Sequence, residues 1–506
     1  MTIPAPSIEY SVLSPMLIVL GAAVTGVLIE AFLPRPVRYS AQLTVTVTGL
    51  LAALVAVISL TGHRSSAVAG SVAIDGPTLF LQAGILVTGL IAIAPIAQHR
   101  LVAFAPQGAL SPRSAAERSA AGSGVIQTEV FPLVMFALSG MLLFPAAADL
   151  LTMFVSLEVL SLPLYVLCGL ARRRRVLAQE AALKYFLLGA FSSAFFLYGV
   201  ALLYGYAGTL TLSGIADAIR IGSGSATLAL TGMALLTVGL LFKVGAVPFQ
   251  SWVPDVYQGA PTPISGFMSA GTKIAAFGAL LRLLYVALPG LIDAWQPVLW
   301  GVAALTMVVG SVLLVTQLNI KRLLAYSSVA NVGFMLVGAT MPAAGLAPTM
   351  FYLLTYGVSA LGAFTVAGLI HNHDEAEDGD ITHWSGLGRR SPFLATALAV
   401  FLLAAAGIPL TSGFIGKFGV LKAAQSDGGT ALVLVAVMCS AIAAFAYARV
   451  IVAMFFREPG PATPVPAPPG PLSTTAVAVA AAATVLLGVT PQPLLTLATR
   501  AAEFLH

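Results

Sequence analysis

Residues 240–252 read LLFKVGAVPFQSW, which places a lysine beside a helix breaker inside a long apolar segment. Pro248 cannot donate to the carbonyl of residue 244, and its ring clashes there, so we expect the helix to break beside Lys243. Broken helices in transporters expose backbone groups to a water-filled cavity where ions bind. A charge at the bilayer centre costs about 2.5–3.5 kcal/mol on insertion scales. The stretch therefore predicts an interrupted membrane helix with a functional lysine; the alternative is a lysine that snorkels to the surface.

The composition of the whole chain agrees with a membrane protein. Of its 506 residues, 58% are hydrophobic and only 8% are charged, whereas soluble proteins carry about 25% charged residues. Because a spanning helix needs about 20 apolar residues, the sequence predicts an all-α polytopic protein with fourteen transmembrane helices. They lie near 11–33, 41–61, 76–98, 128–146, 149–170, 178–206, 227–248, 261–288, 296–317, 322–340, 347–370, 392–421, 429–456 and 472–498.

The basic residues predict an orientation. If the loop after the first span is cytoplasmic, fourteen Lys and Arg residues fall in cytoplasmic segments and four in outer segments. By the positive-inside rule this places both termini on the outer side. The Arg172 to Arg175 run and the loops 99–127 and 457–471 are then cytoplasmic, and neither loop suggests a role.

A second breakable span contains another lysine. Residues 405–420 read AAGIPLTSGFIGKFGV, in which Pro409 precedes Lys417, whereas Pro248 follows Lys243. Such a mirrored order is typical of inverted-topology repeats. We therefore expect three helices and a loop over 1–127, a five-helix repeat over 128–288, an inverted five-helix repeat over 289–457, and a Pro-rich loop with a last helix over 458–506, each repeat having one broken helix.

Two further charged side chains lie in neighbouring predicted spans. Glu158 is fourteen residues before Arg172, and Lys184 is nine residues after Arg175. At 1.5 Å per residue these separations are about 21 Å and 14 Å, so both groups are expected near mid-depth. We predict a buried Glu158–Lys184 pair that switches the charge state of nearby groups; the alternative is a static ion pair that fixes helix packing.

Three more basic residues lie within spans. Lys273, in SAGTKIAAFGALLRLL at 269–284, has small neighbours that suit tight helix packing, and we expect it to connect the two broken helices. Arg282 and Arg449 are interpreted as residues at the ends of spans or in contact with lipid headgroups. His371, His373 and His383 lack strict ligand spacing, so no metal site is predicted.

Other site classes are excluded by what the sequence lacks. No Gly-rich loop follows a strand pattern, so no nucleotide site is predicted. Cys168 and Cys439 stand alone in apolar runs, which gives no disulfide, zinc or iron–sulfur framework. The net charge of +5 is not the footprint of a nucleic-acid partner.

Several motifs together resemble a known family. SLEVLSLPLY (156–165), EAALKYFLLGAFSSAFFLYG (180–199), FKVGAVPFQSWVPDVYQGAPTPIS (242–265), NIKRLLAYSSVANVG (319–333) and GIPLTSGFIGKF (407–418) closely resemble subunit N of bacterial respiratory NADH:quinone oxidoreductase, or complex I. The resemblance covers about residues 128–457. PDVYQGAPTP at 254–263 is its most specific part, since sister antiporter-like subunits and sodium/proton antiporters usually differ there.

The resemblance implies a proton-pumping membrane-arm subunit in the bacterial inner (plasma) membrane. By motif, Glu158 and Lys184 would be the coupling pair, Lys243 and Lys417 the broken-helix lysines, and Lys273 the connecting lysine. NADH, FMN, iron–sulfur clusters and quinone would belong to partner subunits, with no cofactor or metal in this chain. The implied partners are another antiporter-like subunit, small membrane subunits and the lipid bilayer.

Two alternatives use the same residues differently. A subunit of a multisubunit Na⁺/H⁺ antiporter would employ the same lysines without a redox partner, although PDVYQGAP argues against it. A purely structural helical scaffold would use the buried charges only to lock helix packing, so lysine-to-methionine substitutions would alter assembly and leave turnover intact.

Overall fold

The computed structural model describes residues 8–98, 104, 127–171, 175–222, 224–342, 344–371, 379–459, 465–466 and 470–505. The N-terminal half contains α1 (Ser14–Phe32), α2 (Arg35–Ser59), β1 (Ser65–Ala67), β2 (Val72–Ile74), α3 (Gly76–Ile96), α5 (Val130–Leu143), η1 (Phe144–Ala146), α6 (Leu150–Gly169), α7 (Arg175–Ala207), α8 (Leu212–Ile221), α9 (Ala226–Val244) and α10 (Trp252–Gly259).

The remainder begins with a long helix that contains two π-helical turns. This helix consists of α11 (Thr262–Phe267), η2 (Met268–Thr272), α12 (Lys273–Arg282) and η3 (Leu283–Ala287). The elements after it are η4 (Pro289–Leu291), α13 (Ile292–Thr316), α14 (Ile320–Ala339), α15 (Leu346–Leu369), β3 (Ile370–His371), η5 (Ile381–Trp384), α16 (Leu387–Arg390), α17 (Pro392–Ala406), α18 (Ser412–Ser426), α19 (Thr430–Phe456), β4 (Val465–Pro466), α20 (Pro471–Val489) and α21 (Gln492–Ala501).

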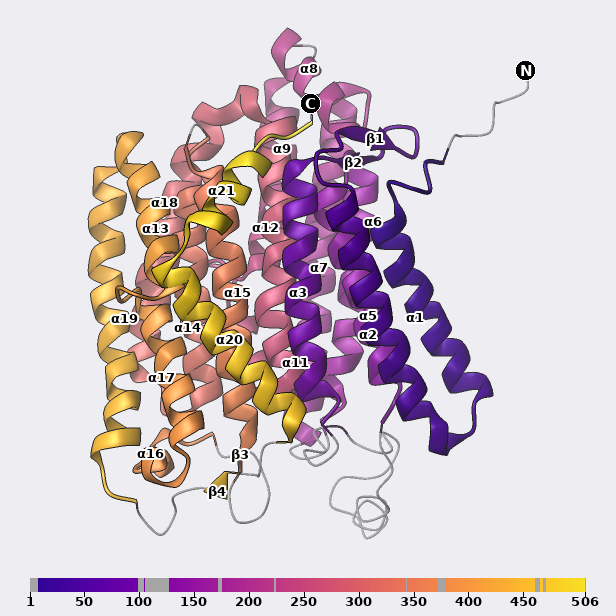
Figure 1. Ribbon diagram of the computed structural model, residues 1–506. Helices are drawn as coiled ribbons and strands as arrows, with labels where there is room; N and C mark the ends of the chain where they lie inside the picture. The colour runs from indigo at the N-terminus through magenta and orange to yellow at the C-terminus, as the bar shows by residue number, and fades with distance from the viewer. Residues whose placement is uncertain are drawn as a thin grey trace.

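The long helices lie side by side in one bundle, and α20 crosses one face obliquely (Figure 1). α20 packs against α3, α15, α17 and α18, so it joins the early and late parts of the chain. The start of α1 and the end of α21 lie at the same end of the bundle, as an even number of spans requires. Which side of the membrane that end faces stays a prediction.

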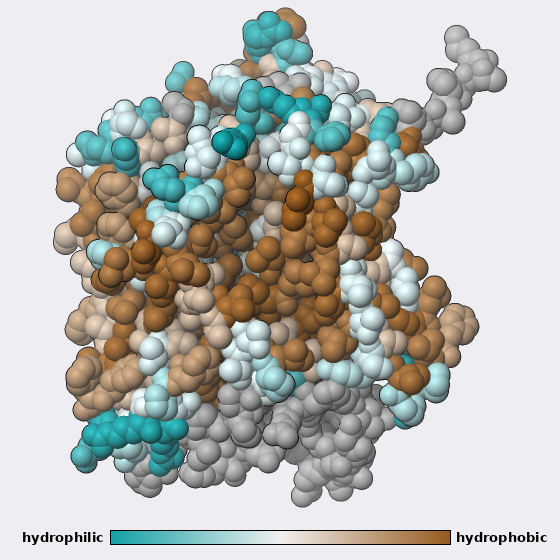
Figure 2. All heavy atoms as spheres, viewed as in Figure 1, coloured by the Kyte–Doolittle hydropathy of each residue, from teal (hydrophilic) through white to brown (hydrophobic). Residues whose placement is uncertain are grey.

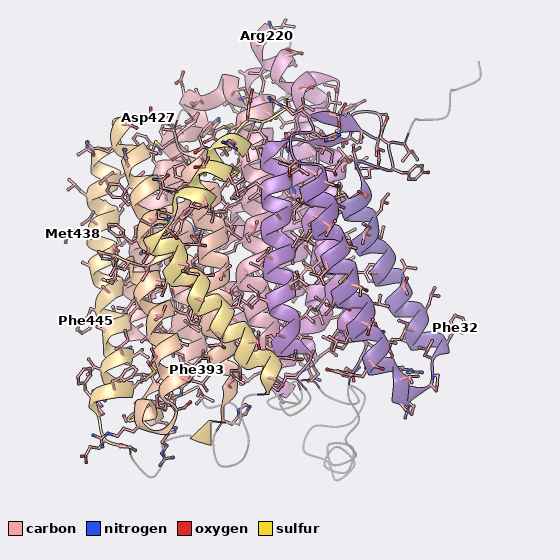
Figure 3. The ribbon with its side chains drawn as sticks, viewed as in Figure 1. Phe32, Arg220, Phe393, Asp427, Met438 and Phe445 are labelled. Carbon is pink, nitrogen blue, oxygen red and sulfur yellow. The ribbon has the colours of Figure 1, made fainter. Side chains whose placement is uncertain are left out.

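The polytopic prediction is confirmed. Twelve helices in the described part of the chain are long and apolar enough to cross a membrane, and Val130–Ala146 and Pro392–Ala406 are shorter apolar helices. Together they account for the fourteen predicted spans. Apolar side chains form a broad band between two polar ends (Figure 2), and exposed Phe32, Met438 and Phe445 point away from the bundle (Figure 3). Such a surface fits a lipid environment.

The last predicted span, 472–498, is wrong at its end. α20 stops at Val489, and α21 is a separate helix that packs against α3 and α15. The reason is local: Pro491 and Pro493 lack the N–H groups that a continuous helix would need. The amphipathic helix α8 and the β1–β2 hairpin were also not predicted.

The centre of the bundle is formed by three segments. The share of the most apolar 18-residue stretch that is buried inside the protein is 94% in Thr262–Ala287 and 89% in both α14 and α15. In α19 and α20 this share is only about a third. A helix that is buried all round belongs to the core of the protein. The polar side chains of these segments are therefore removed from lipid.

Candidate functional site

The chain breaks two membrane helices with the same backbone motif. α9 ends at Val244, where Gly245 adopts φ of 80° and its N–H donates to the Leu241 carbonyl at 3.0 Å. α17 ends at Ala406, where Gly407 adopts φ of 82° and its N–H donates to Leu403 at 3.0 Å. Glycine fits this left-handed position because it has no Cβ. Pro248 and Pro409 lie in the two gaps, and the two predicted helix breaks are confirmed.

The second break depends on a close approach at Gly413. A Cβ added there would lie 1.9 Å from the Ala404 carbonyl oxygen at the end of α17. Gly413→Ala is therefore expected to push α18 from α17 and to lower the free energy of unfolding by about 1–3 kcal/mol, the usual range for overpacking. The measurement is the amount and thermal stability of the purified subunit. Gly21→Ala is the matched control, because nothing lies within 4 Å of Gly21; equal losses in both variants would contradict the expectation.

Lys243 lies at the first break and is fully surrounded by protein. It is buried, and its Nζ donates to Ser161 Oγ at 2.7 Å and to the Tyr185 hydroxyl at 3.0 Å. Ser161 is one turn after Glu158 on α6, and the Glu158 carboxylate interacts electrostatically with Lys243. A lysine held by neutral hydroxyls can gain or lose its proton without breaking a strong ion pair. The snorkelling alternative is excluded by this burial.

The predicted Glu158–Lys184 ion pair is not formed. Lys184 instead lies 2.7 Å from both Glu180 and Asp255, and Glu158 accepts a hydrogen bond from Ser193. Ser193 is nine residues beyond Lys184, about 14 Å along the helix. The depth estimate failed because α7 has 33 residues and is about 50 Å long, well beyond a bilayer core of about 30 Å. Lys184 is thus nearer the helix start, with its side chain 40% exposed.

Asp255 is a charged residue that the sequence interpretation left out. It lies on α10 and joins Lys184 on α7 to Arg322 on α14, whose Nη1 is 2.8 Å from the carboxylate. Arg322 also donates to Gln258. The signal that could have found this cluster is the motif PDVYQGAPTP, which carries the family resemblance and contains both Asp255 and Gln258. The cluster links α7, which carries Lys184, through α10 to α14 at the centre of the bundle.

Lys273 and Lys417 both bind the carbonyl end of a broken helix. Lys273 Nζ donates to the Val244 carbonyl at 2.9 Å, and Lys417 Nζ donates to the Ala405 and Ala406 carbonyls at 2.8 and 3.3 Å. Cations are favoured at helix C-termini, where free carbonyls and the helix dipole are negative. Lys273 therefore belongs to the first break. Its role as the residue that connects the two broken helices stays a prediction.

Arg282 was interpreted as a residue at the end of a span or in contact with lipid headgroups, and the headgroup contact is wrong. It is 1% exposed, and its Nη2 lies 2.7 and 2.9 Å from the two carboxylate oxygens of Asp75, which is 0% exposed. Periodicity could not find this pair, because its partners are 207 residues apart. Arg449 is part-buried and donates to the Gln317 carbonyl at 2.6 Å.

No metal centre is visible among the residues whose structure is described. No three His, Cys, Asp or Glu side chains gather there. His373 and most of the loop 99–127 lie outside the described residues, as does 172–174.

The comparisons with known proteins match this fold. The family model described as the membrane part of NADH:quinone oxidoreductase and Mrp antiporters matches residues 147–443, which contain both broken helices and every predicted site residue. That match defines the class as antiporter-like membrane subunits. Within this class, the chain belongs to the family of NADH-quinone oxidoreductase subunit N.

The relatives that support this assignment span the whole chain. NADH-quinone oxidoreductase subunit N of Rhodococcus opacus (strain B4) is 59% identical, with 99% of this chain and 97% of the relative covered. The subunit N of Mycobacterium tuberculosis (strain H37Rv) is 56% identical over 100% of both chains. A chain of respiratory complex I from Thermus thermophilus with bound aureothin superimposes with a TM-score of 0.79 at 33% identity, covering 97% of this chain and 100% of that one. The Mrp complex of Dietzia sp. DQ12-45-1b gives 0.81 at 23% identity, covering 98% and 97%, which is a likeness of fold.

Proposed function

We propose that this chain is a membrane-arm subunit of a proton-pumping NADH:quinone oxidoreductase and that its own buried lysines carry the proton. The support is the subunit N family over the full length. The observation that carries the proposal is Lys243, a buried ammonium held by two neutral hydroxyls at a helix break. Redox chemistry with NADH, FMN, iron–sulfur clusters and quinone is assigned to partner subunits.

The proposed route uses the five predicted residues with one revision. Glu158 sets the electrostatic environment of Lys243. Lys184 acts through Asp255 and Arg322, so a disturbance at this cluster reaches α10 and α14 together. The proton then leaves Lys243, passes the break that Lys273 stabilises, and reaches Lys417. Moving one charge across 100 mV requires about 2.3 kcal/mol, which a change in one ion-pair cluster can supply.

The surroundings of the route complete the proposal. Both termini lie on the outer side of the bacterial inner membrane, and protons move outward. Residues 128–288 and 289–457 are two inverted repeats, an assignment supported by the matching glycine-capped breaks after Val244 and Ala406. Another antiporter-like subunit, small membrane subunits and lipid are the partners.

The test separates redox-driven pumping from sodium/proton exchange. Inverted membrane vesicles are prepared from cells that lack this chain and from the same cells with the chain restored. Restored vesicles are expected to acidify on addition of NADH, without sodium, and deletion is expected to remove both the acidification and NADH:quinone turnover. A sodium-dependent proton exchange without NADH, lost on deletion while turnover persists, would overturn the proposal in favour of the antiporter alternative.

A further inference from the structure

Buried hydroxyl groups lie between the two broken helices. The series starts at Lys243, whose Nζ donates to the Tyr185 hydroxyl at 3.0 Å. Tyr185 stacks on Trp252 with ring centroids 4.7 Å apart, and Trp252 meets the edge of Tyr257 at 6.2 Å. Tyr257 lies on α10 and interacts electrostatically with Tyr185. The first break is thus connected to α10 by aromatic side chains that carry hydroxyls.

Ser328 on α14 is the next hydroxyl, and it is an orphan. Its side chain is fully buried, and its Oγ completes no well-formed hydrogen bond with any residue that the structure describes. It nevertheless lies beside the hydroxyls of Tyr257 and Tyr356. Buried hydroxyls are almost always paired, with protein or with an ordered water. An orphan between two tyrosine hydroxyls therefore indicates a position at which water or a shared proton completes the contact.

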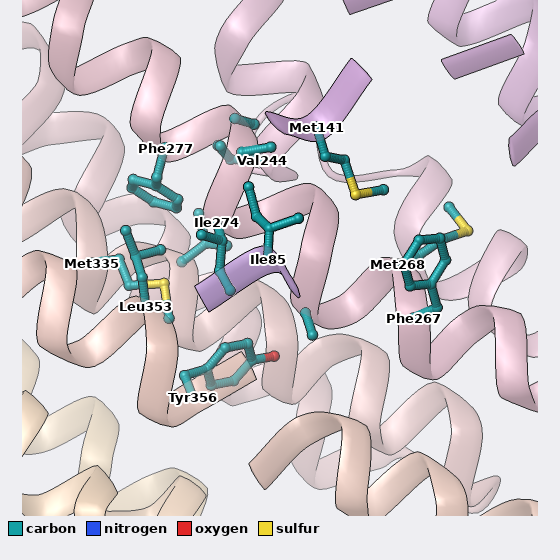
Figure 4. Packing of buried hydrophobic residues seen from close by; sticks show 14 of the residues in the cluster. Ile85, Met141, Val244, Phe267, Met268, Ile274, Phe277, Met335, Leu353 and Tyr356 are labelled. Carbon is teal, nitrogen blue, oxygen red and sulfur yellow. The ribbon is translucent and has the colours of Figure 1, made fainter. Parts of the chain in front are cut away.

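The series continues along α15 to the second break. Tyr356 lies within the apolar core (Figure 4), and its ring centroid is 6.5 Å from that of Tyr352. The Tyr352 hydroxyl donates to Asn331 Oδ1 at 2.5 Å. The Tyr352 ring also packs against Gly416, where an added Cβ would lie 2.5 Å from the ring. Gly416 precedes Lys417 directly, so the ring that carries the last hydroxyl packs against the helix of the second lysine, while the hydroxyl itself binds Asn331.

Lys417 itself is separated from this series by one aromatic ring. Its Nζ lies 4.3 Å from the centroid of the Phe334 ring, and Phe334 is three residues after Asn331 on α14. Lys417 is turned toward the α17 carbonyls rather than toward Tyr352. A water molecule or a movement of the lysine stem past Phe334 is needed to close the last gap.

We propose that Tyr257, Ser328, Tyr356 and Tyr352 form a proton relay between the two broken helices, with Asn331 as the positioning residue that orients Tyr352. The proton leaves Lys243 for the Tyr185 hydroxyl, and each hydroxyl oxygen then accepts one proton from its neighbour and releases its own to the next. Water carries the proton across the gaps from Tyr185 to Tyr257, at Ser328, from Tyr356 to Tyr352, and beside Lys417. No bond other than O–H or N–H forms or breaks, and the charge on Lys243 falls by one as that on Lys417 rises by one. The relay rests on the proposed function.

The decisive variant is Ser328→Ala in the complete membrane complex. Removing an orphan hydroxyl removes no formed hydrogen bond, so the fold is expected to be retained. NADH-driven proton translocation is expected to fall on the order of tenfold or more, since positioned proton-transfer groups contribute at least that much. Ser139→Ala is the matched control, because Ser139 is buried but bonded within its own helix, to Phe136. It is expected to pump like the parent.

Tyr356→Phe is the second variant, with Tyr206→Phe as its control. Tyr206 is also buried, but its hydroxyl binds the Ala218 carbonyl in a separate small cluster. The readouts are protons translocated per NADH oxidised and the rate in D₂O relative to H₂O, neither of which a packing role would change. Parent-like pumping in both relay variants, with Lys243→Ala inactive, overturns the relay and leaves the proposed function standing. Parent-like pumping in Lys243→Ala as well overturns the lysine route itself.

Discussion

Lys243→Ala is expected to abolish NADH-driven proton pumping and to lower NADH:quinone turnover with it, in a complex that still assembles. The physical reason is the position of the ammonium. It is the buried group at the first break that contacts Ser161 and Tyr185 and interacts with Glu158. Because electron transfer and pumping are coupled in such a complex, removing an obligatory proton acceptor stops pumping and slows NADH:quinone turnover. The measurement is acidification and NADH oxidation in inverted vesicles, with assembly followed on a native gel.

Two further variants make this result interpretable. Lys243→Met keeps most of the side-chain volume, so it separates loss of the proton acceptor from a cavity left by alanine. Lys422→Ala removes an exposed lysine from α18, the helix that also carries Lys417, and is expected to leave both activities unchanged. Normal pumping in assembled Lys243→Met would show that Lys243 is structural.

Local chemistry predicted the helix breaks well, because a proline or glycine acts on its own backbone whatever surrounds it. Pro248 and Pro409 therefore marked both interrupted helices, and hydropathy marked the spans. The pairing of charges was predicted less well. Lys184 was placed too deep because its helix extends beyond the bilayer, which the end of an apolar run does not reveal.

Long-range contacts explain the remaining differences. The partner of Arg282 begins a helix some 200 residues earlier in the chain, and no spacing rule connects the two. The hydroxyls of Tyr257, Ser328 and Tyr356 come from three helices and carry no charge, so a search for buried charges could not single them out. Tertiary packing, rather than local pattern, decides such contacts.

Arg282→Met is expected to cause the largest loss of stability, about 3–5 kcal/mol, the cost of leaving one partner of a buried ion pair uncompensated. Arg282 joins four parts of the chain. Besides Asp75 at the start of α3, it donates to the Pro145 carbonyl at 2.7 Å and lies 4.9 Å from the Phe504 ring centroid. Asp75 in turn accepts a hydrogen bond from the Leu505 N–H at 2.9 Å. The measurement is the yield and thermal stability of the assembled complex.

The double variant Asp75→Leu with Arg282→Met distinguishes a buried charge from a packing defect. Removing both charges leaves nothing uncompensated, so it is expected to recover part of the stability that either single change loses. Arg64→Ala is the exposed control. Its partner Glu503 is 2.8 Å away and 72% exposed, and a surface pair contributes about 0–1 kcal/mol. A double variant no more stable than Arg282→Met would show that packing, not charge, is what Arg282 supplies.

The pH dependence of stability gives an independent check on the same pair. Burial raises the pKa of the Asp75 carboxyl, but the Arg282 charge and the hydrogen bonds from Arg282, Leu505 and Thr78 together hold it below its usual value. A carboxyl with a depressed pKa stabilises the fold fully above its unfolded pKa of about 3.9. The contribution is lost as the pH falls through the lower, folded pKa. The thermal stability of the parent should therefore fall more steeply below about pH 4 than that of the double variant, and parallel curves would contradict the assignment.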